Sequence, residues 1–260
     1  KGSEMDPVSP RQTDILKKAR QTGRVEVDDL AIQFDVTPQT IRKDLNEICD
    51  AGLLQRVHGG AVYPSGAINY AYDARRSLAA EEKRRIGETA AALIPDNSSV
   101  ILNIGTTTEQ VAFALRDRDG LMVITNNINV ANILRESPST EVIIAGGLVR
   151  RSDGGIVGEA TVDFIRQFKV DFAVIGVSGI DTDGALLDFD FREVKVAQAI
   201  IANARHVIVV ADQTKFTRTA PVRIGHLGQA HSFITDACPL DSIRQVCAEG
   251  GIKLIETGAA

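Results

Sequence analysis

The sequence is short of the residues that build metal sites and membrane spans. Its cysteines, Cys49, Cys238 and Cys247, are odd in number and lack CxxC spacing, which argues against a disulfide framework or a thiolate metal site. Its four histidines lack the HxxxH spacing that places two imidazoles on one face of a helix. No apolar run approaches the ~20 residues that cross a bilayer. We therefore expect no metal ion, no cofactor and a cytoplasmic protein.

The length and composition fit two globular domains. The chain has 260 residues, of which 44% are hydrophobic and 24% charged. Residues 1–9 are interpreted as a tag remnant and a disordered start, since Lys1–Glu4 precede Met5. We expect a small domain over 10–63, a linker over 64–74 and a larger domain over 75–257.

The net charge of -5 neither supports nor excludes binding to nucleic acid. Phosphate binding needs clustered Lys and Arg, and residues 11–60 hold eight basic and eight acidic side chains. The placement of the basic residues must therefore decide.

Three helices are predicted in the small domain. Pro10–Gln21 has helical spacing of apolar residues, and Asp28 is a good N-cap for a second helix. Thr37 stands at the N-cap of a third, Pro38–Ala51, with proline at its first position. Two short helices joined by a tight turn predict a helix-turn-helix, whose second helix enters the major groove.

A hairpin over Leu53–Tyr63 with a Gly-Gly turn would form a wing beside that helix. The amide of Gln39 suits adenine, and Arg42 suits guanine. The alternatives to DNA-binding roles are that the polar helix face is only solvated and that His58 only occupies a turn position. The predicted DNA-binding residues, from the third helix and the wing, are Thr37, Gln39, Thr40, Arg42, Lys43, Arg56, His58 and Gly59.

After residue 74 the pattern changes to a helix and then to alternating strands and helices. Arg75–Leu93 is predicted as one helix whose mixed charges form a solvated face. The predicted strands are Val100–Ile104, Met122–Thr125, Val142–Ala145, Phe172–Val177, His206–Ala211, Ser232–Thr235 and Lys253–Ile255. Helical segments between them indicate an α/β domain with a mostly parallel sheet.

Five predicted strands end in glycine or polar residues. In parallel sheets ligands bind beyond the carboxyl ends of the strands, and a helix start favours phosphate. The chemistry of these ends suits a polyol phosphate. The predicted ligand-binding residues are Gly105, Thr106, Thr107, Thr108, Asn126, Asn127, Gly146, Gly147, Ser178, Gly179, Asp181 and Lys215. Structural alternatives stay open: threonine also caps helices, Asp181 also caps a turn, and Lys215 also suits an exposed position.

Two stretches resemble the DeoR family of bacterial repressors. The first is Thr37-Pro-Gln-Thr-Ile-Arg-Lys-Asp-Leu-Asn together with Arg56-Val-His-Gly-Gly-Ala. The second set includes Asn103-Ile-Gly-Thr-Thr-Thr-Glu, Asp153-Gly-Gly-Ile-Val-Gly-Glu and Asp212-Gln-Thr-Lys-Phe, and is similar to the sensor domain of that family.

The resemblance implies a ribose-phosphate-isomerase-like sensor fold and a repressor that leaves double-stranded operator DNA when a sugar phosphate binds. It favours sn-glycerol 3-phosphate as the inducer and a homo-oligomer, either a tetramer or a dimer. The alternatives are a related repressor for another phosphorylated sugar and, remotely, a sugar-phosphate isomerase with a DNA-binding appendage. The carboxylates that keep the isomerase open are Asp181, Asp183, Asp188, Asp190 and Glu193, yet nothing in their spacing fixes a general base. We therefore expect no enzyme.

Overall fold

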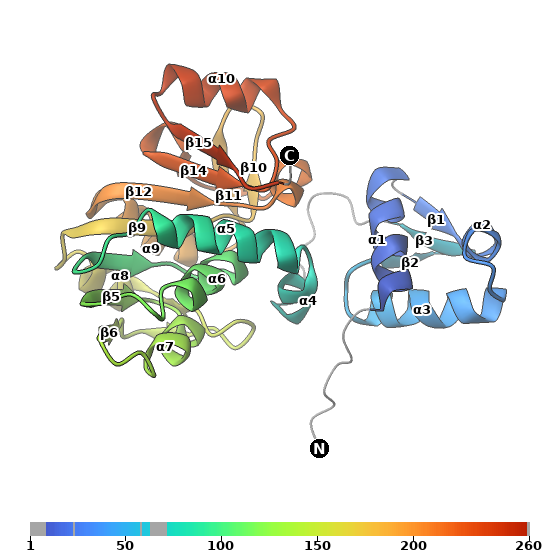
Figure 1. The fold of residues 1–260 in the computed structure, drawn as a ribbon, viewed down its shortest axis with the longest axis horizontal. Helices are drawn as coiled ribbons and strands as arrows, with labels where there is room; N and C mark the ends of the chain where they lie inside the picture. Colours follow the sequence, from blue (N-terminus) through green and yellow to red (C-terminus); the bar gives the residue numbers. More distant parts are fainter. Residues whose placement is uncertain (1–8, 23, 58, 63–71, 259–260) are drawn as a thin grey trace. The chain divides into compact units, whose positions relative to one another are not determined.

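The computed structural model describes residues 9–22, 24–57, 59–62 and 72–258, which fall into two compact units, Lys1–Leu78 and Ala79–Ala260 (Figure 1). The division lies a few residues after the linker that the sequence placed over 64–74. Residues 1–8, His58, Tyr63 and residues 64–71 of the predicted linker lie outside the described residues. Over the described ranges, no helix combines the length and apolarity that a membrane crossing requires.

The N-terminal unit holds a three-helix domain with a small sheet, followed by the short helix α4 (Tyr72–Ser77). The elements of the three-helix domain are α1 (Pro10–Thr22), β1 (Arg24–Glu26), α2 (Val27–Gln33), α3 (Pro38–Asp50), β2 (Gln55–Val57) and β3 (Gly60–Val62). The predicted first and third helices and the wing hairpin are confirmed, and β1 joins the hairpin to give the antiparallel order β1-β3-β2. Ile15, Leu30, Ile41 and Leu45 meet in its core without exposure.

The start of α2 was predicted wrongly. Asp28 lies in the first turn of the helix, and the N-cap is Glu26, which makes no side-chain cap bond. The backbone N–H of Val27 donates to the carbonyl of Gly59 at 2.9 Å, so the sheet itself fixes where the helix begins.

The second unit is built on a seven-stranded parallel sheet in the order β15-β14-β12-β9-β4-β5-β6. All seven predicted strands are present, with ends shifted by a few residues. They are β4 (Ser99–Leu102), β5 (Leu121–Thr125), β6 (Thr140–Ile144), β9 (Val170–Gly176), β12 (Ala204–Val210), β14 (Ser232–Thr235) and β15 (Lys253–Glu256). Because the strands are parallel, their carboxyl ends share one edge of the sheet.

Helices cover both faces of this sheet, which explains its nearly continuous apolar strands. One face packs against α5 (Ala80–Ala92), α6 (Thr106–Ala114) and α7 (Ile128–Leu134). The other packs against α8 (Glu159–Ile165), α9 (Phe191–Ala202) and α10 (Asp241–Glu249). Residues alternate between these two cores along each strand, as Leu102 and Ile101 do.

The helix predicted over Arg75–Leu93 is in fact two helices. α4 (Tyr72–Ser77) and α5 are separated at Ala79, which takes a left-handed φ of 53°. This conformation breaks the helix and coincides with the boundary between the two units.

Two small antiparallel sheets were not predicted from the sequence. β7 (Leu148–Val149) pairs with β8 (Ile156–Val157), and β10 (Gly179–Ile180), β11 (Ala185–Asp188) and β13 (Val222–His226) form the second sheet. Their strands are short and interrupted by turns, so they carry too few alternating residues to give a periodic signal.

Candidate functional site

Helix α3 begins with a well-formed cap and turns a polar face outward. The Thr37 side chain accepts a bond from the Thr40 backbone N–H at 3.2 Å, and Pro38 opens the helix as predicted. Its apolar face buries Ile41, Leu45 and Ile48.

The opposite face of α3 is a shallow hollow. Its lining residues are Thr37, Gln39, Thr40, Arg42, Lys43, Asn46 and Glu47. Gln39, Arg42 and Lys43 are exposed, whereas the hydroxyls of Thr37 and Thr40 bond each other at 2.9 Å. The side chains available to DNA bases at the start of this helix are therefore the amide and the two cations.

The backbone of the wing hairpin requires glycine at two positions. Gly59 has a φ of +79°, and a Cβ at Gly60 would lie 2.0 Å from the carbonyl oxygen of Val25. The exposed Arg56 donates to the Gly60 carbonyl at 3.1 Å, which holds its guanidinium against the turn.

The carboxyl edge of the large sheet carries the second candidate site, which begins at α6. Gly105, the N-cap of α6, has a φ of +148°, and Thr108 donates to its carbonyl at 2.7 Å. Among the described residues, the hydroxyls of Thr106 and Thr107 have no protein partner. The backbone N–H groups of a helix start and two unbonded hydroxyls can together hold a phosphate.

The next strand end places Asn126 and Asn127 in different roles. The Nδ2 of Asn126 donates to the Ile156 carbonyl at 3.2 Å, and its buried Oδ1 has no partner. The side chain of Asn127 caps α7 by accepting from Asn129 N–H, and it also donates to Glu109 at 3.3 Å. Asn127 is thus committed to the protein, while Asn126 keeps an acceptor.

Three other predicted ligand residues have structural roles that the geometry explains. Gly147 has a φ of +152°, and a Cβ there would lie 2.2 Å from the Thr161 hydroxyl oxygen. A Cβ at Gly179 would lie 2.5 Å from the Arg218 carbonyl oxygen. Asp181 lies in the exposed turn between β10 and β11, where it accepts from Thr182 N–H at 2.7 Å, and not at the end of a parallel strand.

The two remaining predicted positions, Gly146 and Ser178, follow β6 and β9. Gly146 is exposed, and its carbonyl accepts a bond from Thr161 at 2.9 Å. Ser178 is buried and donates to Asp188 at 3.0 Å. Asp188 was not among the predicted site residues.

Beyond β12, a buried carboxylate lies between two lysines. Lys215 Nζ lies 4.0 Å and Lys83 Nζ 3.9 Å from Asp212 Oδ2, with relative exposures of 6%, 2% and 0%. Burial alone would raise the pKa of Asp212, but Lys215 and Lys83 lower it to about 2. The expectation of a solvated face for the charge run of α5 is wrong at Lys83, which stands one turn before the buried Ile86 on the apolar stripe.

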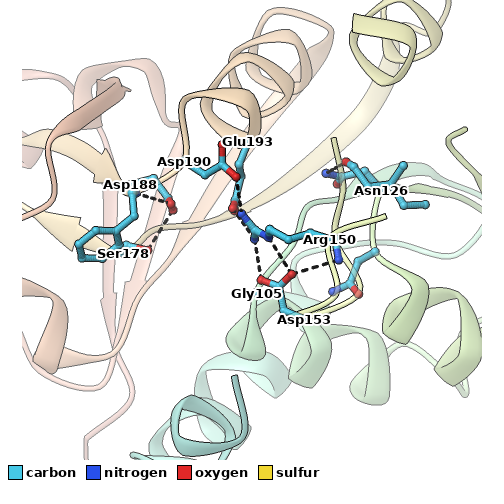
Figure 2. A network of polar contacts seen from close by, with 12 residues as sticks. Gly105, Asn126, Arg150, Asp153, Ser178, Asp188, Asp190 and Glu193 are labelled. Atoms are coloured by element: carbon cyan, nitrogen blue, oxygen red, sulfur yellow. Dashed lines mark hydrogen bonds and ion pairs between the residues drawn. The ribbon is translucent and has the colours of Figure 1, made fainter. Parts of the chain in front are cut away.

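Figure 2 shows a network that the sequence analysis missed, centred on Arg150 in the loop between β7 and β8. Its guanidinium pairs with Asp153 and Glu193, each at 2.6 Å, and with Asp190 at 3.4 Å. Burial opposes the charge of Arg150, yet Asp153 and Glu193 hold its pKa above the usual value. The network ties the β7–β8 loop to the start of α9.

The carboxylates of this network differ in their protonation. Desolvation, followed by repulsion from Asp188, raises the pKa of Glu193 to about 8. Bonds from Arg192 lower the pKa of Asp190 to about 2. Burial therefore dominates the pKa of Glu193, whereas hydrogen bonds from Arg192 dominate that of Asp190.

Asn103, at the end of β4, is the second missed residue. It is 1% exposed, and neither its Nδ2 nor its Oδ1 has a hydrogen-bond partner. The sequence offered one signal, because Asn103 opens the Asn-Ile-Gly-Thr-Thr-Thr stretch. Within the described ranges no cluster of three or more His, Cys, Asp or Glu side chains is arranged to hold a metal ion.

A capped helix with an exposed polar face, a glycine-turned wing and an α/β unit with a polar sheet edge together define a winged helix-turn-helix protein with a sensor-type domain. Two family models match these same parts. The DeoR-like helix-turn-helix domain matches residues 11–67, and the DeoR C-terminal sensor domain matches residues 78–237. The chain belongs to the DeoR family.

Its similarity to curated relatives extends along nearly the whole chain. It is 46% identical over 244 residues to the glycerol-3-phosphate regulon repressor of Escherichia coli (strain K12), covering 94% of this chain and 97% of the relative. The protein of that name from Haemophilus influenzae is 45% identical, with 95% and 96% covered. The transcriptional repressor CsqR of Escherichia coli is 37% identical, with 95% of each chain covered.

Solved structures resemble only about half of the chain. Ribose 5-phosphate isomerase A from Neisseria gonorrhoeae matches with a TM-score of 0.39 and 12% identity, covering 53% of this chain and 54% of that one. eIF2B delta from Chaetomium thermophilum matches with a TM-score of 0.41 and 15% identity, covering 56% and 57%. These likenesses carry no conclusion about function.

Proposed function

We propose that this chain is a transcriptional repressor that binds operator DNA through α3 and the wing. It acts in the cytoplasm, where bacterial operator DNA lies, and it leaves the operator when its larger unit binds sn-glycerol 3-phosphate. The observation that carries the proposal is the start of α3, where a Thr37 cap and a buried apolar face leave Gln39, Arg42 and Lys43 exposed.

The proposed inducer is supported by the polar groups of the strand ends and by the similarity to curated relatives. The unbonded hydroxyls and the helix start at Gly105–Thr108 suit a phosphate, and the polar strand ends beside them suit hydroxyl groups. Two relatives of 46% and 45% identity are named glycerol-3-phosphate regulon repressors, which favours this phosphate over a larger sugar phosphate.

The carboxylates of the larger unit favour ligand binding over isomerisation. Asp188 accepts from Ser178, and Asp190 and Glu193 are paired with Arg150. Asp181 and Asp183 are exposed in a turn. A general base must be free to reach the proton that it removes. The first three carboxylates are engaged with Ser178 or Arg150, and the last two do not lie at the end of a parallel strand. We therefore propose a binding protein with no enzymatic turnover.

The repressor is proposed to act as a dimer or a tetramer. A helix-turn-helix presents one recognition helix to one half-site, and pairs of subunits read two half-sites about one DNA turn apart. A palindromic operator would therefore match a two-fold axis of the protein.

The DNA-binding part is tested by Arg42→Ala and its effect on operator affinity. The probe is a fluorescent duplex enriched from random sequence by the wild-type chain, and affinity is read from anisotropy. Loss of a forked contact to guanine lowers affinity by ~5- to 150-fold, the equivalent of about 1–3 kcal/mol.

Arg135→Ala is the matched control, because Arg135 is an exposed arginine of the larger unit. It should leave operator affinity unchanged, and both variants should bind sn-glycerol 3-phosphate as the wild type does. Unchanged operator affinity in Arg42→Ala would refute the assigned DNA-binding face.

A further inference from the structure

We propose that Asn103 binds a hydroxyl group of the inducer and, with Asn126, sets the specificity of the site for a polyol. This inference rests on the proposed function, whose phosphate end it complements. Three buried amide atoms without partners, Asn103 Nδ2, Asn103 Oδ1 and Asn126 Oδ1, carry it.

The two amides are neighbours on one face of the sheet. The register pairs Leu102 of β4 with Thr125 of β5, so Asn103 and Asn126 are the next pair along the two strands. The backbone N–H of Asn103 donates to the Val174 carbonyl at 3.1 Å, which continues the strand ladder through this residue. By alternation both side chains lie on the face of Ile101 and Ile124.

The unpaired amide atoms of Asn103 and Asn126 indicate a ligand that can form hydrogen bonds with them. A buried polar group without a hydrogen bond costs free energy, and such groups are uncommon in folded proteins unless a ligand or water satisfies them. An amide both donates and accepts, which is what one alcohol group requires. The Oδ1 of Asn126 adds an acceptor for a second hydroxyl.

The surroundings favour a neutral end of the ligand here. Asn126 bonds the backbone of Ile156, in β8, and the β7–β8 loop carries Arg150 and Asp153 (Figure 2). That loop also contacts the β4 end, since a Cβ at Gly155 would lie 2.5 Å from Ile104 Cδ1. Several carboxylates face one guanidinium in that loop, so an anionic group of the ligand would be repelled there. The phosphate therefore belongs at the α6 start, and the hydroxyls belong at the two amides.

The test is a double cycle between the protein amide and the ligand hydroxyls, read by titration calorimetry. The proteins are the wild type, Asn103→Leu and the smaller Asn103→Ser. The ligands are sn-glycerol 3-phosphate and its two deoxy analogues, propane-1,3-diol monophosphate and propane-1,2-diol 1-phosphate. We expect Asn103→Leu to weaken binding of glycerol 3-phosphate at least tenfold, Asn103→Ser to weaken it less, and one analogue to bind wild type and variant within about twofold of each other.

A second readout, taken without ligand, separates this role from a structural one. Removing an unpaired buried amide should keep or raise the melting temperature in Asn103→Leu, because the folded state no longer carries its desolvation cost. The matched control is Asn203→Ala, whose amide donates to the Ala199 carbonyl at 2.7 Å, and it should lower the melting temperature without changing ligand affinity.

Equal weakening of all three ligands, or a lowered melting temperature of Asn103→Leu, would overturn the assignment of Asn103. Failure of the wild type to bind glycerol 3-phosphate would instead refute the proposed inducer, and the melting temperatures would still decide whether Asn103 is structural.

Discussion

The helix-turn-helix with its wing and the sheet edge of the larger unit differ in their buried polar groups. In the described side chains of the helix-turn-helix and wing, residues 9–19, 22, 24–57 and 59–62, no buried nitrogen or oxygen lacks a hydrogen-bond partner. At the sheet edge of the larger unit, amide atoms of Asn103 and Asn126 do. The first unit presents its chemistry on an exposed helix face, whereas the second keeps it buried and incomplete, as a site for a small ligand requires.

The largest expected effect is on stability, and it is measured by making an Asp→Asn substitution in each unit. Asp212→Asn removes the negative charge that Lys83 and Lys215 both face in a fully buried site, and should lower the free energy of unfolding by about 3–5 kcal/mol. Asp44→Asn breaks the bond to Arg11 at 2.6 Å, but Arg11 is 34% exposed and can turn to water. Its loss should be about 1 kcal/mol.

Urea denaturation of both variants measures this difference. Asp163→Asn is the control, because Asp163 makes only an exposed pair with Arg166, and it should change stability little. Equal losses in Asp212→Asn and Asp44→Asn would remove the contrast between the two units.

A further effect should appear in the pH dependence of stability. The folded pKa of Glu193 is raised to about 8 from 4.5, so between these values the native state holds a proton that the unfolded chain has lost. The contribution of Glu193 to stability should therefore fall as pH rises from about 5 to 8, with a slope of at most about 1.4 kcal/mol per pH unit. Asp190 and Asp212, with pKa values of about 2, titrate below this window.

Glu193→Gln should flatten that slope, because glutamine does not titrate. Glu141→Gln, which removes an exposed carboxyl of the edge strand β6, should keep the wild-type slope. Thermal melts at half-unit pH steps measure both, and a wild-type slope retained in Glu193→Gln would contradict the buried, protonated Glu193.

Local signals made much of the fold predictable. The cap at Thr37 and Pro38, the glycines of the wing and the seven apolar strands each depend on neighbours in the sequence, and the structure confirms them. The break at Ala79 was not predictable in this way, since alanine normally favours helix and yet takes a left-handed φ of 53° here.

The candidate site was predictable only at its strand ends. Glycine and threonine at Gly105–Thr108 mark a helix start from sequence alone, but Arg150 meets Glu193 across 43 residues of chain. Likewise, Lys83 looked solvated in a run of alternating charges, and only the packing of α5 buries it. Long-range burial decides which charged residues build the site, and single-sequence periodicity does not report it.

The most direct test of the account is release of the operator by the proposed inducer. Anisotropy of the labelled operator duplex should fall to the free value as sn-glycerol 3-phosphate is added, because inducer favours the conformation that binds DNA less well. Glycerol and inorganic phosphate, each supplying half of the contacts, should release little at the same concentration. A complex that glycerol 3-phosphate leaves intact but a hexose phosphate dissolves would contradict the account.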